Sequence, residues 1–149
     1  MDFKLRINSL LEMDEFAHKI SFYISKGFII GLKGDLGSGK TTFTKYLAFY
    51  LGVHETVNSP TFTILKIYQG KLPVYHIDAY RLENSSYDYE LDEFIYDDGV
   101  AIIEWYPYIE QMLPKDFLAI NIEFVDEFIR DITVKGSGKY AKIVQEISY

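Results

Sequence analysis

The sequence predicts a single α/β domain, residues 1–149, in which helices flank a mixed, mostly parallel β-sheet with antiparallel strands at its C-terminal end. Short apolar runs of strand length alternate with helix-length amphipathic segments, as in sheets whose parallel strands are joined by helices. The last third of the chain has strand-like runs separated by short polar turns, which is typical of antiparallel strands. A chain of 149 residues that is 48% hydrophobic is long enough for one sizeable core and too short for two.

The composition narrows the classes of function. A formal net charge of −7 argues against a broad nucleic-acid groove, which needs clustered lysine and arginine, but not against a partner that handles nucleic acid. The absence of cysteine excludes disulfides and thiolate metal sites. No signal peptide opens the chain and no apolar run reaches membrane-spanning length. We therefore expect a cytoplasmic protein that does not associate with membranes.

The first part of the chain is expected to form a strand, a helix and a second strand. Residues 3–7 have the pattern of a short edge strand. Ser9 and Glu12 have the spacing of a helix capping box. Apolar residues follow at helical spacing, at positions 13, 16, 17, 20 and 24, and Gly27 is predicted to end this helix. Residues 28–33 are then predicted to form a buried strand that enters the next motif.

The stretch after this strand, Gly34-Asp35-Leu36-Gly37-Ser38-Gly39-Lys40-Thr41-Thr42, satisfies the phosphate-binding pattern G-x-x-x-x-G-K-[ST]. A predicted helix, residues 42–51, follows it, so the motif has the strand-loop-helix context that it needs. Glycines let backbone N–H groups approach phosphate oxygens, Lys40 supplies charge, and the Thr41 hydroxyl is placed to bind Mg²⁺. We predict that residues 35–42 bind a nucleoside phosphate, and that Lys40 is solvated apart from that ligand.

The middle of the chain is predicted to form a hairpin, an acidic helix and another buried strand. The hairpin comprises residues 62–68 and 74–77. The turn before it, Ser59-Pro60-Thr61, is either a plain turn or a switch loop whose hydroxyls sense a γ-phosphate. Residues 87–96 form either a solvated acidic helix face or a docking surface for a basic partner. Residues 100–103 form a purely apolar run.

The C-terminal part is predicted to contain a short helix bracketed by Pro107 and Pro114, followed by three strands. These strands are residues 118–124, 128–134 and 140–147, and the last two are joined by a glycine-rich turn.

Two acidic residues compete for the place of the metal-binding acid that phosphoryl transfer requires. Glu104 ends the apolar run 100–103, whereas Asp78 ends a shorter run that His76 interrupts. We predict that Glu104 binds Mg²⁺ and that Asp78 orients or deprotonates water, or holds the waters of the metal. The alternative for Asp78 is a turn residue. His76 either lies near Asp78 or is a core histidine, and Arg81 either stabilises phosphate charge or forms a structural ion pair.

Missing motifs separate the classes of P-loop protein. Neither Asn-Lys-x-Asp nor Asp-x-x-Gly occurs, which disfavours a Ras-like GTPase, and no Leu-Ser-Gly-Gly-like signature indicates a transporter ATPase. Kinases of nucleoside monophosphates clamp phosphoryl groups with several arginines, whereas this chain has only Arg6, Arg81 and Arg130. A switch-like ATPase is favoured. The alternatives are a small-molecule P-loop kinase and a nucleotide-binding module without turnover.

Four blocks of sequence resemble the bacterial TsaE (YjeE) family of small P-loop ATPases. They are Gly34 to Phe43, Val57-Asn58-Ser59-Pro60-Thr61-Phe62, His76-Ile77-Asp78-Ala79-Tyr80-Arg81-Leu82 and Ile103-Glu104-Trp105. The resemblance extends from Ser9 to about Gly138. It implies ATP and Mg²⁺ as cofactors and a role in forming N6-threonylcarbamoyladenosine in tRNAs that read codons beginning with A.

The resemblance also implies a partner and roles for individual residues. The partner is the TsaD–TsaB complex, which carries the transferase chemistry and through which alone the protein reaches tRNA. Slow ATP hydrolysis then supports turnover of that complex. Lys40 and Thr41 match the Walker A lysine and the metal-binding threonine of the family. Glu104 matches the acid assigned to Mg²⁺, Asp78 a second acid important for hydrolysis, and Trp105 the tryptophan beside the nucleotide.

Overall fold

The computed structural model describes residues 1–35, 37–58, 64–82 and 91–148, without the side chain of Arg81. The strands are β1 (Asp2–Ile7), β2 (Ile29–Lys33), β3 (Leu65–Gln69), β4 (Pro73–Asp78), β5 (Val100–Glu104), β6 (Leu118–Phe124) and β7 (Arg130–Gly136). The helices are α1 (Leu10–Ser21), α2 (Lys40–Tyr50), α3 (Leu91–Ile95) and α4 (Lys139–Ile147), with 3₁₀ segments η1 (Tyr80–Leu82) and η2 (Tyr106–Met112).

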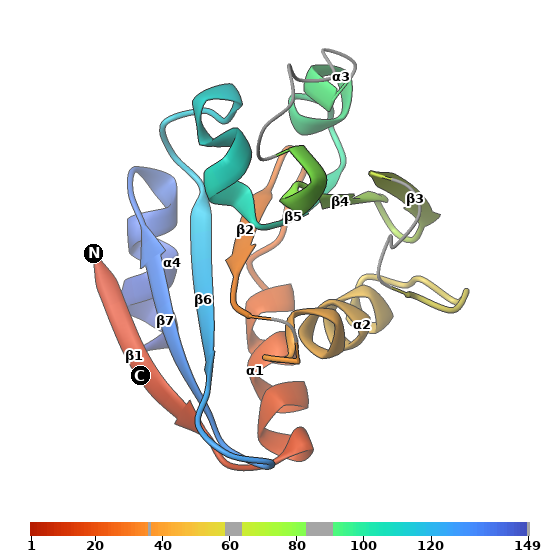
Figure 1. Cartoon of the computed structure of the whole chain (residues 1–149). Helices are drawn as coiled ribbons and strands as arrows, with labels where there is room; N and C mark the ends of the chain where they lie inside the picture. The colour runs from red at the N-terminus through yellow and green to blue at the C-terminus, as the bar shows by residue number, and fades with distance from the viewer. Residues whose placement is uncertain (36, 59–63, 83–90, 149) are drawn as a thin grey trace.

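Within the described residues all strands belong to one sheet, in the order β1-β7-β6-β2-β5-β4-β3 (Figure 1). The central pairs β6–β2, β2–β5 and β5–β4 are parallel. The pairs β1–β7, β7–β6 and β4–β3 are antiparallel. The predicted α/β class is therefore confirmed, with a parallel centre and antiparallel C-terminal strands.

Apolar residues on the central strands point alternately to the two faces of the sheet, and each face has its own core. On β5, Val100 and Ile102 pack in the cluster that contains the buried residues of α1, α2 and α4. Ala101 and Ile103 pack instead in a second cluster with residues of η1, α3 and η2. A strand buried on both faces needs a continuous apolar run, which explains the pattern at residues 100–103.

The first helix begins as predicted but ends earlier. The Ser9 hydroxyl accepts the backbone N–H of Glu12 at 3.1 Å, and the Glu12 carboxylate accepts the N–H of Asn8 at 3.0 Å. Met13, Phe16, Ala17 and Ile20 are buried, as their spacing predicts. However, α1 ends at Ser21, so Gly27 does not end it. With φ of +78°, Gly27 lies in the turn that enters β2.

The middle elements follow the prediction wherever they are described. β3 and β4 form the expected antiparallel hairpin, and β5 ends at Glu104. The acidic segment contains the short helix α3, whose Asp92 and Glu93 are exposed. Residues 87–90 of this segment and the turn at residues 59–61 lie outside the described residues.

The prediction of a third C-terminal strand is wrong, because residues 140–147 lie in the helix α4. Tyr140, Val144 and Ile147 are its buried residues, and this spacing of four and three residues is that of a helix face. The hydroxyl of Tyr140 accepts the backbone N–H of Ile29 in β2 at 3.0 Å. The helix therefore packs on the sheet and satisfies a buried donor of the strand that leads into the P-loop.

In the part of the chain that the structure describes, no helix is long and apolar enough to cross a membrane.

Replacing Tyr140 with Phe should remove only the hydroxyl that accepts the N–H of Ile29. Leaving a buried backbone donor unpaired costs about 1–3 kcal/mol, so we expect the free energy of unfolding in urea to fall by that amount. Tyr96→Phe is the matched control, because its hydroxyl bonds the carbonyl of Met112 on the exposed surface. The Tyr96→Phe substitution should change the free energy of unfolding by no more than about 0.5 kcal/mol. Equal losses of stability in both variants would contradict a stabilising hydrogen bond between Tyr140 and Ile29.

Candidate functional site

The parallel strands β2, β5 and β4 bring three segments to one edge of the sheet. The P-loop follows β2, Trp105 follows β5, and Asp78 ends β4 (Figure 1). Leu32 pairs with Glu104, and Glu104 pairs with Asp78, so the strands end at the same level. Crevices at the carboxyl ends of parallel strands are where α/β proteins bind ligands. The register alone therefore places both candidate acids beside the P-loop.

The P-loop backbone has the conformation that its glycines permit. Gly37 and Gly39 have φ of +81° and +113°, a region that other residues rarely adopt. Gly39 is the N-cap of α2, and the N–H of Ser38 donates to the carbonyl of Asp35 at 2.9 Å. The Ser38 hydroxyl is buried without a hydrogen-bond partner among the described residues. The loop leads into the N-terminus of α2, where unpaired N–H groups favour an anion.

Lys40 is buried, with 6% of its surface exposed, so the expectation that it is solvated is wrong. Its ammonium donates to the carbonyls of Gly34 and Asp35 in the P-loop itself. Burial lowers the pKa of Lys40, whereas the negative charges of Glu104, Asp78 and Asp35 oppose this shift. A lysine held in this way has two of its three N–H groups on loop carbonyls in the absence of a phosphate.

The two acids have different surroundings. Glu104 is buried, with 4% of its surface exposed, and its Oε2 lies 2.6 Å from Nε2 of His76. Asp78 is half-buried, and its Oδ1 accepts the backbone N–H of Tyr80 at 3.0 Å. This bond is the one expected of a turn-forming aspartate. His76 is thus a buried core histidine, as one of the two alternatives predicted, and its described hydrogen bond is to Glu104.

Trp105 connects the lysine to a group of aromatic rings. It has φ of +60°, the only positive φ at a non-glycine position in the described residues, and its N–H donates to the carbonyl of Leu32 at 2.7 Å. The Lys40 ammonium lies 5.0 Å from the centre of its ring, within the range of a cation–π interaction. Tyr80 and Tyr108 contact the same ring at centroid distances of 5.4 and 5.8 Å.

Arg130 holds the opposite side of the P-loop. Its Nε donates to the carbonyl of Ser38 at 2.7 Å and its Nη2 to that of Gly37 at 3.3 Å. Its Nη1 donates to the carbonyl of Asp126 at 2.5 Å, within the turn between β6 and β7. The guanidinium also lies 4.7 Å from the centre of the Phe124 ring. One side chain therefore ties the β6–β7 turn to the P-loop.

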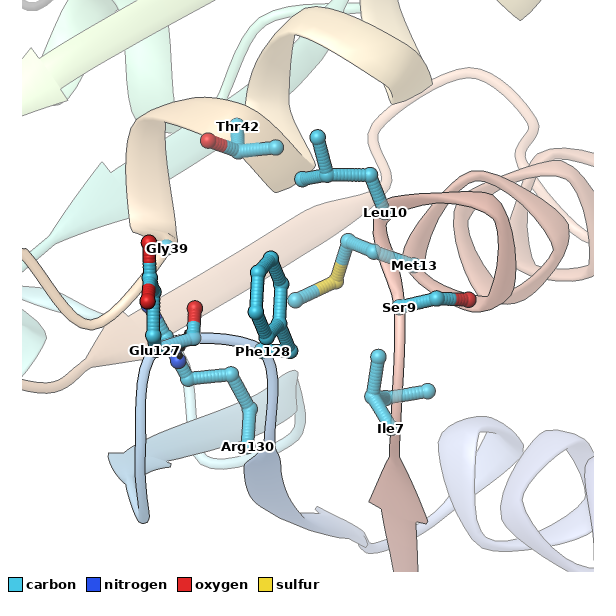
Figure 2. A pocket seen from close by; sticks show the side chains of 9 residues that line it. All are labelled: Ile7, Ser9, Leu10, Met13, Gly39, Thr42, Glu127, Phe128 and Arg130. Atoms are coloured by element: carbon cyan, nitrogen blue, oxygen red, sulfur yellow. Dashed lines mark hydrogen bonds between the residues drawn. The ribbon is translucent and has the colours of Figure 1, made fainter.

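A hollow opens beside Arg130 at the start of α2 (Figure 2). Its apolar lining comes from the end of β1, α1 and the β6–β7 turn, and consists of Ile7, Leu10, Met13 and Phe128. Gly39 and Thr42 form its border with the P-loop. Figure 2 draws Phe128 and Met13 among the side chains that line this hollow, and Met13 Cε lies 3.5 Å from where a Cβ on Gly39 would be. Phe128 is 66% exposed, so a large apolar ring faces solvent at the edge of this hollow.

Sequence comparison identifies the family to which these features belong. A family model described as threonylcarbamoyl adenosine biosynthesis protein TsaE matches residues 7–132, which include both acids, the P-loop and the β6–β7 turn. The chain belongs to the TsaE family.

Individual TsaE proteins and a solved structure agree with this assignment. The protein named tRNA threonylcarbamoyladenosine biosynthesis protein TsaE from Bacillus subtilis (strain 168) is 45% identical over 128 residues, covering 85% of this chain and 81% of that protein. Its namesake from Treponema pallidum (strain Nichols) is 39% identical over 113 residues, covering 74% and 84%. The crystal structure of YdiB from Bacillus subtilis superposes with a TM-score of 0.84 at 35% identity, covering 99% of this chain and 94% of YdiB.

The site residues predicted from the sequence lie on two sides of the TsaE P-loop. Trp105 lies against Lys40, and the charges of Asp78 and Glu104 act on it, whereas Thr42 lines the hollow. Thr41 is half-buried in the first turn of α2, and Asp35 is exposed. Leu36 and the side chain of Arg81 lie outside the described residues. The binding and catalytic roles of all these residues remain predictions.

Sequence reasoning missed Arg130 and the hollow. No local motif marks them, because their position depends on the pairing of β6 with β2 and of β6 with β7. The sheet topology was the one feature that could have indicated their position. A strand that pairs in parallel with the P-loop strand delivers its following turn to the same edge of the sheet.

Replacing Arg130 with Met should loosen the P-loop without unfolding the protein. Hydrogen bonds from a charged group are worth about 1.5–3 kcal/mol each, so amide hydrogen exchange at residues 37–39 should accelerate about tenfold or more. Arg6→Met is the control, because Arg6 forms an exposed ion pair with Asp131 on β7. It should leave P-loop exchange unchanged. Unchanged exchange in the Arg130 variant would show that this side chain does not restrain the loop.

Proposed function

We propose that the chain binds ATP with Mg²⁺ and hydrolyses it slowly, as a component of the machinery that forms N6-threonylcarbamoyladenosine in tRNA. The observation that supports this most strongly is the buried ammonium of Lys40. It donates to P-loop carbonyls, and the negative charges of Glu104 and Asp78 at the carboxyl edge of the sheet oppose the lowering of its pKa. A buried cation with a lowered pKa is costly for folding and is typical of functional sites.

The oxygen-rich surroundings of Lys40 suit Mg²⁺. The Thr41 hydroxyl and the Glu104 carboxylate are the predicted protein ligands, and Asp78, which pairs with Glu104 in the sheet, is predicted to act through a metal-bound water. In the described part of the chain, no three or more His, Cys, Asp or Glu side chains gather as a metal site. Mg²⁺ typically takes one or two protein ligands and completes its octahedron with phosphate and water, so this sparse donor set fits it. The bound ion would neutralise phosphate charge during transfer.

We infer that the nucleoside packs against the hollow beside Arg130, whose cavity of about 60 Å³ is too small to enclose a base. Phosphates that lie on the P-loop amides place the attached ribose past Gly39 and Thr42, which border this hollow. Its apolar lining from Leu10, Met13 and Phe128 offers faces for a planar base. Trp105 lies on the other side, beside the Lys40 ammonium, and we infer that it reports on the phosphate end of the nucleotide.

The names of the TsaE relatives indicate the biosynthetic pathway in which those proteins act. We infer from them that the chain acts in threonylcarbamoyladenosine biosynthesis, and from the family resemblance that its partner is the TsaD–TsaB complex. The net charge of −7 supports an indirect route to tRNA through that complex. A small-molecule kinase receives less support, since Arg6 pairs with Asp131 and Arg130 bonds loop carbonyls.

The central role of Lys40 can be tested with Lys40→Met. Because burial lowers the pKa of Lys40, the protonated lysine costs stability below its folded pKa. The variant should therefore be at least as stable as the wild type at neutral pH. Its affinity for ATP with Mg²⁺ should fall about 100-fold or more, measured by calorimetry. Lys45→Met, at an exposed position of α2, should bind normally. Normal nucleotide affinity in the Lys40 variant would refute the proposal.

The roles of the two acids can be separated by mutation. Glu104→Ala should weaken the binding of ATP only when Mg²⁺ is present, and raised Mg²⁺ should partly restore it. Asp78→Asn should bind ATP with Mg²⁺ nearly normally but hydrolyse it on the order of 10²–10⁴ times more slowly. Asp92→Asn, an exposed acid in α3, is the control for both. The opposite pattern in calorimetry and phosphate release would mean that the two roles are reversed.

A further inference from the structure

The pair formed by His76 and Glu104 is a buried polar contact beside the P-loop. His76 is fully buried, Glu104 is 4% exposed, and the two side chains meet at 2.6 Å through Nε2 and Oε2. The other ring nitrogen of His76, Nδ1, is buried without a hydrogen-bond partner among the described residues. The imidazole ring of His76 is therefore buried in the core with one described hydrogen bond, the one to Glu104.

The strand register explains why these two residues meet. His76 pairs with Ile102, and Asp78 pairs with Glu104, on the parallel strands β4 and β5. Side chains alternate between faces, so His76 and Glu104 lie diagonally on the same face. This face carries Val74, Val100 and Ile102, which pack in the α1–α2 core. The neighbours of His76 on this face are therefore mostly aliphatic.

An aliphatic residue at position 76 would avoid a substantial cost. Burying an imidazole with one unpaired nitrogen is unfavourable, and buried ionic pairs often stabilise a fold no better than apolar residues of similar size. Stability alone is therefore a poor reason for a histidine here. Without it, however, Glu104 would keep a buried carboxylate with no partner at Oε2.

We propose that His76 is a positioning residue that holds Glu104 by Oε2 and so fixes the orientation in which this carboxylate meets the divalent cation. The inference rests on the proposed function, in which Glu104 is the metal-side acid. A hydrogen-bond partner behind a metal-binding group fixes its orientation, and loss of such a partner typically lowers metal affinity about 10–100-fold. The negative charge of Glu104 also acts on Lys40, so this orientation influences the phosphate-binding lysine as well.

The test compares two polar substitutions that differ in reach. In His76→Gln the amide nitrogen takes roughly the position of Nε2 and can donate to Glu104. In His76→Asn the amide is shorter and falls at the position of Nδ1. ATP affinity is measured by calorimetry with Mg²⁺ and with a chelator. The ratio of these affinities reports metal binding, whereas general damage to the fold weakens ATP binding under both conditions.

We expect His76→Asn to reduce this ratio about 10–100-fold, while the ATP affinity measured with the chelator changes little. His76→Gln should retain most of the wild-type ratio. Tyr75→Phe is the matched control. Tyr75 is next to His76 on β4, so its side chain lies on the opposite face of the sheet. The substitution removes only the hydroxyl that bonds Asp97, and it should leave the ratio unchanged. If His76→Asn does not unfold cooperatively, His76→Phe replaces it, because that ring fills the space without a donor.

A double-mutant cycle shows whether His76 acts through Glu104. In the Glu104→Gln background, His76→Asn should produce no further loss of the ratio. An undiminished ratio in the single His76→Asn variant, or the same loss in both backgrounds, would overturn the inference. A wild-type protein that binds no ATP, or whose ATP affinity does not depend on Mg²⁺, would instead refute the proposed function.

Discussion

The site depends on the parallel alignment of β2, β5 and β4. Leu32, Glu104 and Asp78 occupy one level across these strands, and this single register sets the distance between the P-loop and both acids. A slip of one residue would turn Glu104 to the other face and bury Ile103 against α2. The aliphatic residues that fill both faces of β5 prevent such a slip. Core packing and site geometry are therefore consequences of the same pattern.

The P-loop is held from two sides by cations that bond its own carbonyls. Lys40 bonds Gly34 and Asp35 from within, and Arg130 bonds Gly37 and Ser38 from the β6–β7 turn. We expect these two sets of hydrogen bonds to respond differently when a nucleotide binds. Lys40 has to exchange carbonyls for phosphate oxygens, whereas Arg130 can keep its bonds because they face the turn. Arg130 therefore belongs to the scaffold of the site, and Lys40 to its chemistry.

Local patterns predicted most of the fold, and they failed where position depends on packing. The apolar run 100–103 and the motif around Lys40 carry their own periodicity and spacing, so both strand and loop were predictable. The prediction of a strand at residues 140–147 was wrong, because the apolar residues at positions 140, 144 and 147 have the spacing of a helix face. Glu104 and Asp78 were found as strand-end acids. The bond between His76 and Glu104, and the reach of Arg130 to the loop, require the sheet order, which no short stretch of sequence encodes.

Phosphate release from ATP, measured with and without the TsaD–TsaB complex, tests the central proposal most directly. Of the arginines with described side chains, Arg6 pairs with Asp131 and Arg130 bonds P-loop carbonyls, so neither is placed to stabilise the transferring phosphoryl group. A missing arginine is typically worth about 10³–10⁵ in rate. We therefore predict slow release by the isolated protein with Mg²⁺, and a rise of about tenfold or more when the complex is added. Release that is absent in both conditions, or equally fast in both, would contradict a partner-dependent ATPase.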